Sequence, residues 1–285
     1  MNLCDRDEIR QLLSRHGFRF DKGKGQNFLI EDWVPREIAA ASGADEKTGV
    51  LEIGPGIGPL TNELCKLASK VVSIELDTRL YPVLEETMAT FDNFTLIPGD
   101  AMKTDLCKLI DEQFVGLRPI LCANLPYNIT SPMLTRLVES GCFESLTVLI
   151  QKEVAQRICA QPGTADYSAF TLLMQYYTEP ELLFEVPASC FLPAPKVTSA
   201  VIHCPVRKAP PVEVRDTACF WRTVRAGFAL RRKTLVNSLQ TGFDLPKEKL
   251  SQMITACGLE TSIRGERLSL EEYARLSDAL YDAMQ

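Results

Sequence analysis

The fold of this chain is decided by the stretch VLEIGPGIGPLT, residues 50–61. Its apolar first half is typical of a buried parallel strand, and glycines at alternate positions follow before a helix begins. Glycines at such a turn let the backbone bend tightly and let a ligand lie directly against it. The stretch therefore predicts a strand, a ligand-binding loop and a helix, although taken alone it also fits an ordinary glycine-rich turn.

The spacing of the glycines indicates which ligand the loop binds. A dinucleotide-binding loop has the pattern Gly-x-Gly-x-x-Gly beneath a pyrophosphate. Here Gly54, Gly56 and Gly58 place the third glycine one residue early, and Glu52 lies just before the loop. A carboxylate repels a pyrophosphate but accepts hydrogen bonds from a cationic ligand. S-Adenosylmethionine, with its sulfonium and amino-acid group, fits this pattern better than NAD.

A sheet is expected to continue beyond this loop. Strands alternating with helices imply an α/β fold with a parallel sheet and right-handed crossovers. Helical patterns also precede the loop. The expected strands are 70–77, 94–100, 119–124 and 146–150, and the expected early helices are 5–16 and 32–41.

Polar side chains stand at the ends of three expected strands. Because ligands bind at the carboxyl ends of parallel strands, Glu75, Asp100 and Asn124 should meet beside the glycine loop. Glu75 follows Gly54 by 21 residues and is placed to accept hydrogen bonds from both ribose hydroxyls. Asp100 can accept from the adenine amino group. Each acid alone could be a strand-end or helix-capping residue, and their convergence favours the cofactor.

The C-terminal part has a different pattern. Two further strands are expected at 182–186 and 197–205, and residues 207–211 have linker chemistry. Helical patterns then follow at 216–239, 246–257 and 270–284. The expected domains are therefore 1–206, which binds the cofactor, and 207–285, which is helical.

Composition narrows the class of protein. The 285 residues, 46% hydrophobic and 24% charged, suit a soluble globular chain with one large and one small domain. The charged N-terminus lacks a signal-peptide core, and the charge-free run 119–135 holds three prolines, so no membrane span is expected. Ten scattered cysteines and two histidines argue against metal ligation and for reduced thiols in the cytoplasm.

Basic residues gather in one part of an acidic chain. The net charge is −6, but residues 206–243 carry eight Lys or Arg against two acids, a local charge of +6. Segregated charge of this kind indicates nucleic acid, although a solvated basic face is the alternative. The basic loop 18–29, with Arg19, Lys22 and Lys24, is a second candidate. The expected RNA-binding residues are Arg222, Arg225, Arg231, Arg232 and Lys233.

The run Asn124-Leu125-Pro126-Tyr127 carries the acceptor-side chemistry. An adenine amine is a poor nucleophile because its lone pair is delocalised into the ring. The Asn124 side-chain carbonyl and a backbone carbonyl near Leu125 can accept from both amine hydrogens, while Pro126 rigidifies the turn. Tyr127 offers a face for base stacking. A turn with a core tyrosine is the alternative.

Phe191 lies in a proline-stiffened loop, residues 189–196, and could close over the other face of an extruded base. The alternative is an apolar plug at a domain junction.

Five motifs in this order resemble the KsgA/RsmA family of small-subunit ribosomal RNA adenine dimethyltransferases. The resemblance runs from about Gly25 to the C-terminal helices. The motifs are Gly25-Gln26-Asn27-Phe28-Leu29, Leu51-Glu52-Ile53-Gly54-Pro55-Gly56-x-Gly58, Asn124-Leu125-Pro126-Tyr127-Asn128-Ile129, Phe191-x-Pro193-x-Pro195-Lys196-Val197-x-Ser199 and Arg231-Arg232-Lys233-x-Leu235.

The resemblance implies a Rossmann-like class I methyltransferase sheet of seven mostly parallel strands, with a small all-helical C-terminal domain. It implies dimethylation of the N6 amines of two adjacent adenosines near the 3′ end of small-subunit (16S) RNA. S-Adenosylmethionine would be the cofactor and the small ribosomal subunit the partner of a monomeric protein. The implied cofactor-binding residues are Asn27, Leu29, Gly54, Gly56, Glu75, Asp100 and Asn124.

Three other functions remain open at this stage. The erythromycin-resistance methyltransferases of large-subunit RNA share the cofactor loop and an Asn-x-Pro-aromatic motif. A non-catalytic ribosome-assembly or transcription factor could keep the fold, although intact Glu75, Asp100 and Asn124 argue against lost catalysis. A small-molecule N-methyltransferase would leave the basic segment unexplained.

Overall fold

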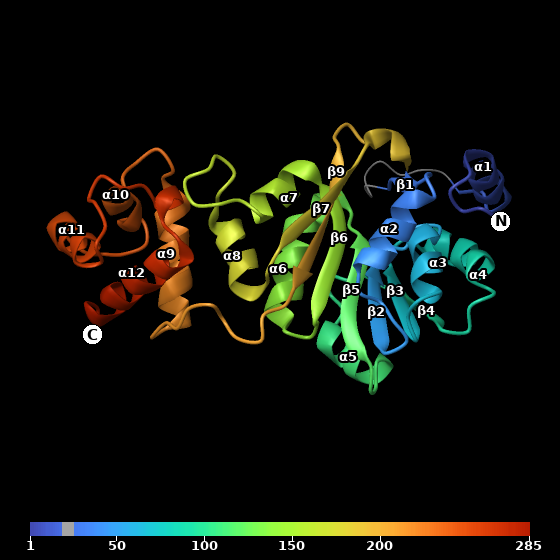
Figure 1. Ribbon diagram of the computed structural model, residues 1–285, viewed down its shortest axis with the longest axis horizontal. Helices are drawn as coiled ribbons and strands as arrows, with labels where there is room; N and C mark the ends of the chain where they lie inside the picture. Colours follow the sequence, from blue (N-terminus) through green and yellow to red (C-terminus); the bar gives the residue numbers. More distant parts are fainter. Residues whose placement is uncertain (19–25) are drawn as a thin grey trace. The chain divides into compact units, whose positions relative to one another are not determined.

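A computed structural model describes residues 1–18 and 26–285 (Figure 1). The chain forms two compact units, of which unit 1 is Met1–Ala155 with Thr178–Val206 and unit 2 is Gln156–Tyr177 with Arg207–Gln285. Unit 2 thus takes in a segment that the expected first domain, 1–206, had included. The physical reason is burial, because Tyr167, Leu172 and Tyr176 belong to the hydrophobic core of the C-terminal helices.

Unit 1 is built on one seven-stranded sheet in the order β4-β3-β2-β5-β6-β9-β7. The first five strands are parallel, and β9 runs antiparallel to both β6 and β7, so the expected mostly parallel sheet is confirmed. The chain moves from β2 outward to β4 and returns to β5 on the other side of β2. The strand order thus reverses between β2 and β5, and ligands of open α/β sheets bind at such a reversal, outside the carboxyl ends of the strands. The strands are β2 Thr48–Ile53, β3 Lys70–Glu75, β4 Phe94–Pro98, β5 Arg118–Asn124, β6 Ser145–Gln151, β7 Glu181–Val186 and β9 Ser199–Pro205.

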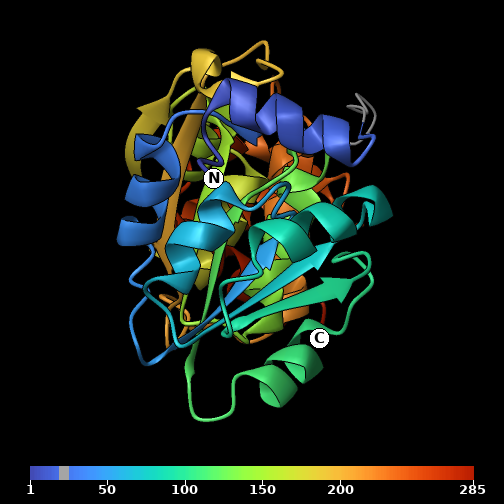
Figure 2. The same cartoon turned by 90° about the vertical axis from the view of Figure 1, so that its right-hand side faces the viewer.

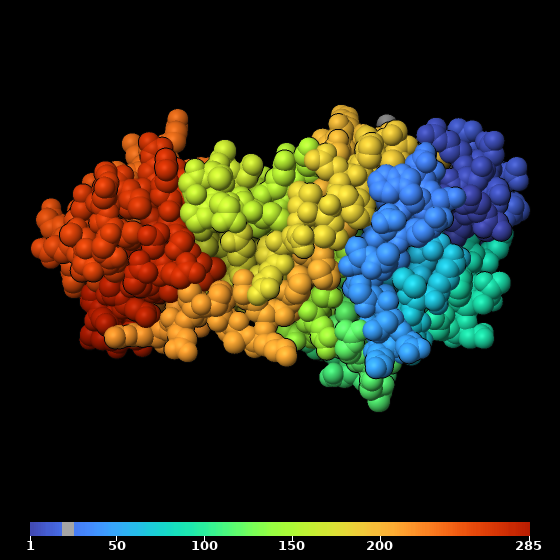
Figure 3. Space-filling model, in the orientation of Figure 1, coloured from blue at the N-terminus to red at the C-terminus, as the bar shows by residue number. Residues whose placement is uncertain are grey.

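Helices pack around this sheet, and the edge of the sheet formed by β4 and β3 faces the viewer in Figure 2. Their buried faces are apolar at helical spacing, as Ile9, Leu12 and Leu13 are in α1. Trp33 of α2 lies 6.0 Å from Phe184 of β7 between ring centroids, and their segments adjoin in the space-filling view (Figure 3). The helices are α1 Arg6–Arg15, α2 Trp33–Ala41, α3 Pro59–Cys65, α4 Tyr81–Thr87, α5 Leu106–Gln113, α6 Thr130–Ser140 and α7 Lys152–Ile158.

A second, two-stranded sheet was not expected from the sequence. Strand β1, Phe28–Leu29, pairs antiparallel with β8, Phe191–Leu192, so that Leu29 lies opposite Phe191. The pairing ties the segment before α2 to the proline-rich loop before β9, although about 160 residues separate them in the chain. Runs of two residues carry too little periodicity to be seen as strands in a sequence.

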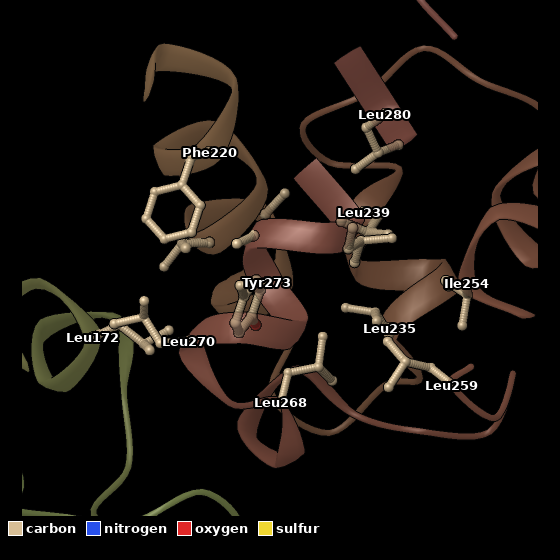
Figure 4. Close-up of a cluster of buried hydrophobic side chains, with 14 of the residues drawn as sticks. Leu172, Phe220, Leu235, Leu239, Ile254, Leu259, Leu268, Leu270, Tyr273 and Leu280 are labelled. Atoms are coloured by element: carbon tan, nitrogen blue, oxygen red, sulfur yellow. The ribbon is translucent and has the colours of Figure 1, made fainter. Parts of the chain in front are cut away.

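Unit 2 is helical, with a core of leucines and aromatic side chains (Figure 4). The helix expected at 216–239 ends instead at Ala229 and resumes at Leu235, and a turn closed by Lys233 N–H to the Leu230 carbonyl (2.8 Å) fills the gap. Gly227 allows close packing in this core, because a Cβ there would collide with the Tyr273 hydroxyl. The helices are α8 Ala169–Tyr177, α9 Thr217–Ala229, α10 Leu235–Leu239, α11 Lys247–Ala256 and α12 Leu270–Asp282.

The cysteines differ from expectation at one pair. Cys107 in the first turn of α5 and Cys142 just after α6 form a disulfide, with Cα atoms 5.5 Å apart, whereas the sequence led us to expect only thiols. Chain spacing could not reveal the pair, because 35 residues separate its members. The other eight cysteines are thiols that form no disulfide within the described chain, and six of them are buried. Among the described residues, no helix combines the length and apolarity needed to cross a membrane.

Candidate active site

A pocket opens at the carboxyl ends of the central parallel strands and encloses about 990 Å³, counting its open mouth. The pocket is lined by the segment before and in β1, the glycine loop, and the ends of β3, β4 and β5. The lining residues are Gln26–Leu29, Glu52–Gly56, Pro59, Leu60, Ile74–Asp77, Leu80, Gly99–Ala101, Asn124–Tyr127 and Ile129.

The glycine loop needs its glycines for two reasons. Gly54, Gly56 and Gly58 have φ angles of +71°, +63° and +94°, which side chains rarely tolerate. A Cβ at Gly56 would also lie 3.1 Å from ring carbons of Phe28, so the ring covers the loop at close range. At Gly54 and Gly56 the loop therefore presents backbone without a side chain to the pocket.

Glu52 forms the buried floor of the pocket. Its side chain is 1% exposed, and its Oε2 accepts hydrogen bonds from Thr61 Oγ1 and Ser73 Oγ, both at 2.7 Å. Burial raises the pKa of Glu52 from its ordinary 4.5 to about 7, and the two hydroxyl donors oppose that rise. Whether this carboxyl meets a cationic ligand stays a prediction.

Glu75 ends β3 at the pocket wall. It is buried, and its Oε1 accepts the backbone N–H of Asp77 at 2.7 Å. Burial raises the pKa of Glu75, whereas backbone donors, Asp77 first and Gly56 among the others, lower it. The carboxyl group is thus held in one orientation by the backbone around it.

Asp77 anchors the segment that precedes β1. Its carboxylate accepts from Gln26 Nε2 at 2.8 Å and pairs with the Arg79 guanidinium, with an Nη2–Oδ2 distance of 2.5 Å. Neither Gln26, Phe28 nor Asp77 was among the expected site residues, although all three line the pocket. Their nearness in sequence to Asn27, Leu29 and Glu75 was the available signal.

Asp100 lines the pocket from the turn after β4. Its Oδ1 accepts the backbone N–H of Met102 at 2.9 Å, and Oδ2 lies 3.8 Å from Lys103 Nζ. The side chain is half-buried, so part of the carboxylate faces the pocket while the turn fixes its direction.

The Asn124–Tyr127 run follows β5 at the same edge of the sheet. Asn124 Nδ2 donates to the Asn27 carbonyl at 3.4 Å, which leaves the amide oxygen as an acceptor. The Pro126 carbonyl already accepts from Thr130 Oγ1 (3.1 Å) and from the Ile129 N–H (3.2 Å). The Pro126 carbonyl is thus occupied, and the role of the Leu125 carbonyl as second acceptor for an amine stays a prediction.

Phe191 is placed differently from our expectation. It is 2% exposed, lies in the hydrophobic cluster with Leu29 and Val201, and does not line the pocket. Pairing of β8 with β1 turns this ring inward. Phe191 thus lies where the alternative, an apolar plug, would put it, and its role over a target base stays a prediction.

The five expected RNA-binding residues all lie in unit 2 and are exposed, but they differ in their contacts. Arg222 donates to the Gly242 carbonyl (2.6 Å) and stacks over Phe243, and Arg231 donates to the Ala165 carbonyl. By contrast, no side-chain hydrogen bond or ion pair with a described residue engages Arg225, Arg232 or Lys233.

Arg19, Lys22, Lys24 and Gly25 lie outside the residues that the structure describes.

The strand order, the glycine loop and the polar strand ends define a Rossmann-like class I methyltransferase. The ribosomal RNA adenine dimethylase family matches residues 17–282 of the chain. The chain is also 45% identical over 276 residues to ribosomal RNA small subunit methyltransferase A of Geobacillus thermodenitrificans, covering 95% of this chain and 94% of that one. The same enzyme of Shouchella clausii is 45% identical over 279 residues, covering 96% and 94%. The chain therefore belongs to the ribosomal RNA adenine dimethylase family.

Solved structures agree on the fold. The 23S rRNA methyltransferase ErmE superposes with a TM-score of 0.68 at 25% identity, covering 90% of this chain and all of that one. A dimethyladenosine transferase from Plasmodium falciparum superposes with a TM-score of 0.72 at 24% identity, covering 87% and 95%.

Proposed function

We propose that this protein transfers methyl groups from S-adenosylmethionine to the N6 amines of two adjacent adenosines near the 3′ end of small-subunit ribosomal RNA. The observation that carries the proposal is that the glycine loop, Glu75 and Asp100 share one pocket with the Asn124–Tyr127 run. A cofactor site and an amine-binding site are thus contiguous. The identity of 45% to two small-subunit methyltransferases supports the choice of RNA.

The residues present fit S-adenosylmethionine. The backbone at Gly54 and Gly56 can lie against its amino-acid part, Glu75 can accept from the ribose hydroxyls, and the half-buried Asp100 can accept from the adenine amine. Asn27 and Leu29 would cover it from the segment that Gln26 fixes to Asp77. When bound, S-adenosylmethionine supplies an electrophilic methyl group on a sulfonium.

The target amine would be activated by the acceptors that orient its two hydrogens. The Asn124 Oδ1 and Leu125 carbonyl would accept its two hydrogens and favour the pyramidal form, whose lone pair is available for attack. Stacking of the base on Tyr127 is worth roughly 1–3 kcal/mol. The attacking nitrogen would form its bond to the methyl carbon as the bond from that carbon to sulfur breaks, which leaves S-adenosylhomocysteine. The methylated amine would then lose a proton readily, so the site needs no strong general base. Orientation of this kind lowers the activation barrier by several kcal/mol.

The exposed cations of unit 2 would hold the RNA. Among them, Arg225, Arg232 and Lys233 make no side-chain hydrogen bond or ion pair with a described residue. A monomeric state and a cytoplasmic location remain predictions from the sequence.

The decisive experiment is radiolabelled methyl transfer to unmethylated small subunits, with naked small-subunit RNA and large subunits in parallel. We expect label in the small subunit, and acid-digested RNA should contain N6,N6-dimethyladenine. Label confined to the large subunit would instead assign the protein to the activity named for ErmE, and no transfer to any RNA would favour a binding role.

A further inference from the structure

The hydroxyl of Tyr127 makes a hydrogen bond that the catalytic scheme above does not use. Tyr127 Oη lies 2.6 Å from Ser199 Oγ, a short bond between residues 72 positions apart. Ser199 is the first residue of β9 and is 0% exposed, so its hydroxyl contacts protein and not solvent. A buried hydroxyl of this kind destabilises the folded protein when it lacks a hydrogen-bond partner.

Ser199 is held far more rigidly than Tyr127. It lies between two strands, opposite Gln151 of β6 and Val186 of β7, and the neighbouring Thr198 carbonyl accepts the Lys152 N–H at 3.0 Å. Tyr127, by contrast, begins a single 3₁₀ turn, Tyr127–Ile129, none of whose residues is buried. Its ring direction is therefore not fixed by packing on all sides, and the hydroxyl tether supplies the missing constraint.

The segment between Phe191 and Ser199 contacts a pocket-lining residue at each of its two ends. At one end Phe191 pairs with Leu29, which lines the cofactor side of the pocket. At the other end Ser199 meets Tyr127, which lines the target side. The segment thus contacts both walls of the pocket without entering it, since none of its residues belongs to the lining.

We propose that Ser199 is a positioning residue for methyl transfer, which holds the Tyr127 ring in the orientation that stacks the target adenine beside Asn124. The inference rests on the proposed function, because it assumes that the base stacks on Tyr127. A tyrosine phenol is protonated at physiological pH, and burial raises the pKa of Tyr127 further, so its O–H is available for the bond. Losing the tether would leave the stacking face intact but allow the ring to rotate.

The test compares Tyr127→Phe, Ser199→Ala and their double variant in methyl transfer to unmethylated small subunits. Each change removes the same hydrogen bond, and Tyr127→Phe keeps the ring. We expect kcat to fall roughly 3- to 10-fold in each single variant, the size of one net hydrogen bond. The double variant should be no slower than the singles, since the bond can be lost only once. The KM for S-adenosylmethionine and the subunit affinity should not change.

Two controls separate positioning from stability and from the proposed function. Ser42→Ala removes a buried hydroxyl of unit 1 that donates to the Ala39 carbonyl (2.7 Å) away from the pocket, and should leave kcat unchanged. Tyr127→Ala removes the stacking face itself. Full activity of Tyr127→Ala would overturn the stacking role and with it this inference. A large loss in Tyr127→Ala with parent kcat in both Tyr127→Phe and Ser199→Ala would overturn the inference alone. So would additive losses in the double variant.

Discussion

The pocket of unit 1 and the basic residues of unit 2 are both parts of the expected functional surface, yet they are built in opposite ways. In the pocket, Glu52 and Glu75 are buried and each accepts hydrogen bonds from neighbouring protein groups. In unit 2, Arg225 and Lys233 are exposed and make no side-chain ion pair with a described residue. The pocket is preorganised before any ligand arrives, whereas the basic residues can adapt to the RNA.

This difference suits the two tasks. Methyl transfer requires the reacting atoms to be held within a narrow range of positions, and fixed side chains supply that. Phosphate binding requires charge and reach more than direction, and its energy comes largely from counterion release. Substitutions in the pocket should therefore have large, specific effects, and those among the basic residues small, graded ones.

The largest expected effect is that of Asn124→Ala. Removing the amide oxygen takes away an acceptor that matters most as the amine becomes pyramidal, so kcat should fall by two to three orders of magnitude. Subunit binding should stay within about twofold. Initial rates at saturating S-adenosylmethionine measure this, with exposed Asn128→Ala, which is absent from the pocket lining, as the matched control. Near-normal turnover would remove Asn124 from the mechanism.

Next is the pH dependence caused by Glu52. Its pKa is raised in the folded state to about 7, so between pH 4.5 and 7 the folded protein holds a proton that the unfolded chain has lost. The free energy of unfolding therefore falls as pH rises through this window, by roughly 3 kcal/mol, and is constant above it. Glu52→Gln keeps the acceptor for Thr61 and Ser73 but cannot ionise.

The difference in unfolding free energy between parent and Glu52→Gln, measured by denaturant at a series of pH values, isolates this effect from other groups. It should change by roughly 3 kcal/mol across the window and level off on either side. A difference independent of pH would mean that Glu52 ionises as it does in the unfolded chain.

The same contrast explains what could be predicted from the sequence. The place of Glu75, Asp100 and Asn124 in the pocket lining could be predicted because Glu75 and Asn124 end strands and Asp100 follows one closely. Strand ends in a parallel sheet meet at one edge. The burial of Phe191 could not be predicted, because it depends on a two-residue pairing with β1 that leaves no periodic signal. Likewise, the segment 156–177 gave no sign that its aromatic side chains join the core of unit 2.

For the basic residues the sequence identified the charge but not its use. The break after Ala229 puts Arg231, Arg232 and Lys233 in a turn, where helical spacing no longer determines direction. Which cations are free and which are engaged by carbonyls is decided by tertiary contacts, such as those of Arg222 with Gly242 and Phe243.

A smaller effect is expected for Glu75→Ala on cofactor affinity. Loss of the carboxylate would leave the ribose hydroxyls without acceptors, which weakens S-adenosylmethionine binding by about 2 kcal/mol, roughly 30-fold in Kd. Calorimetry measures this directly. Glu63→Ala, a change of equal charge in α3 outside the pocket lining, should leave Kd unchanged. Equal affinities in folded Glu75→Ala and parent would rule out the ribose contact.

The smallest effects are expected among the basic residues, and they test the comparison itself. Replacing Arg225, Arg232 and Lys233 together by Gln removes three cations that no described protein group engages. Affinity falls with salt, and for every phosphate that is no longer neutralised the plot of log affinity against log salt should become less steep by about 0.7 to 0.9. The expected change is thus up to about 2 to 3 in slope, with cofactor affinity unchanged because the pocket is untouched.

The control is the double variant Arg222→Gln with Arg231→Gln, whose guanidinium groups already donate to protein carbonyls. These groups have fewer N–H donors left for phosphate, so the slope should change less per residue than in the triple variant. Small-subunit binding across a salt series, with cofactor titrated in parallel, measures both. Superimposable salt curves for parent and triple variant would mean that this part of unit 2 is only a solvated face. The RNA would then have to be sought along the N-terminal loop with Arg19, Lys22 and Lys24, and adaptability would no longer be the property that sets the two regions apart.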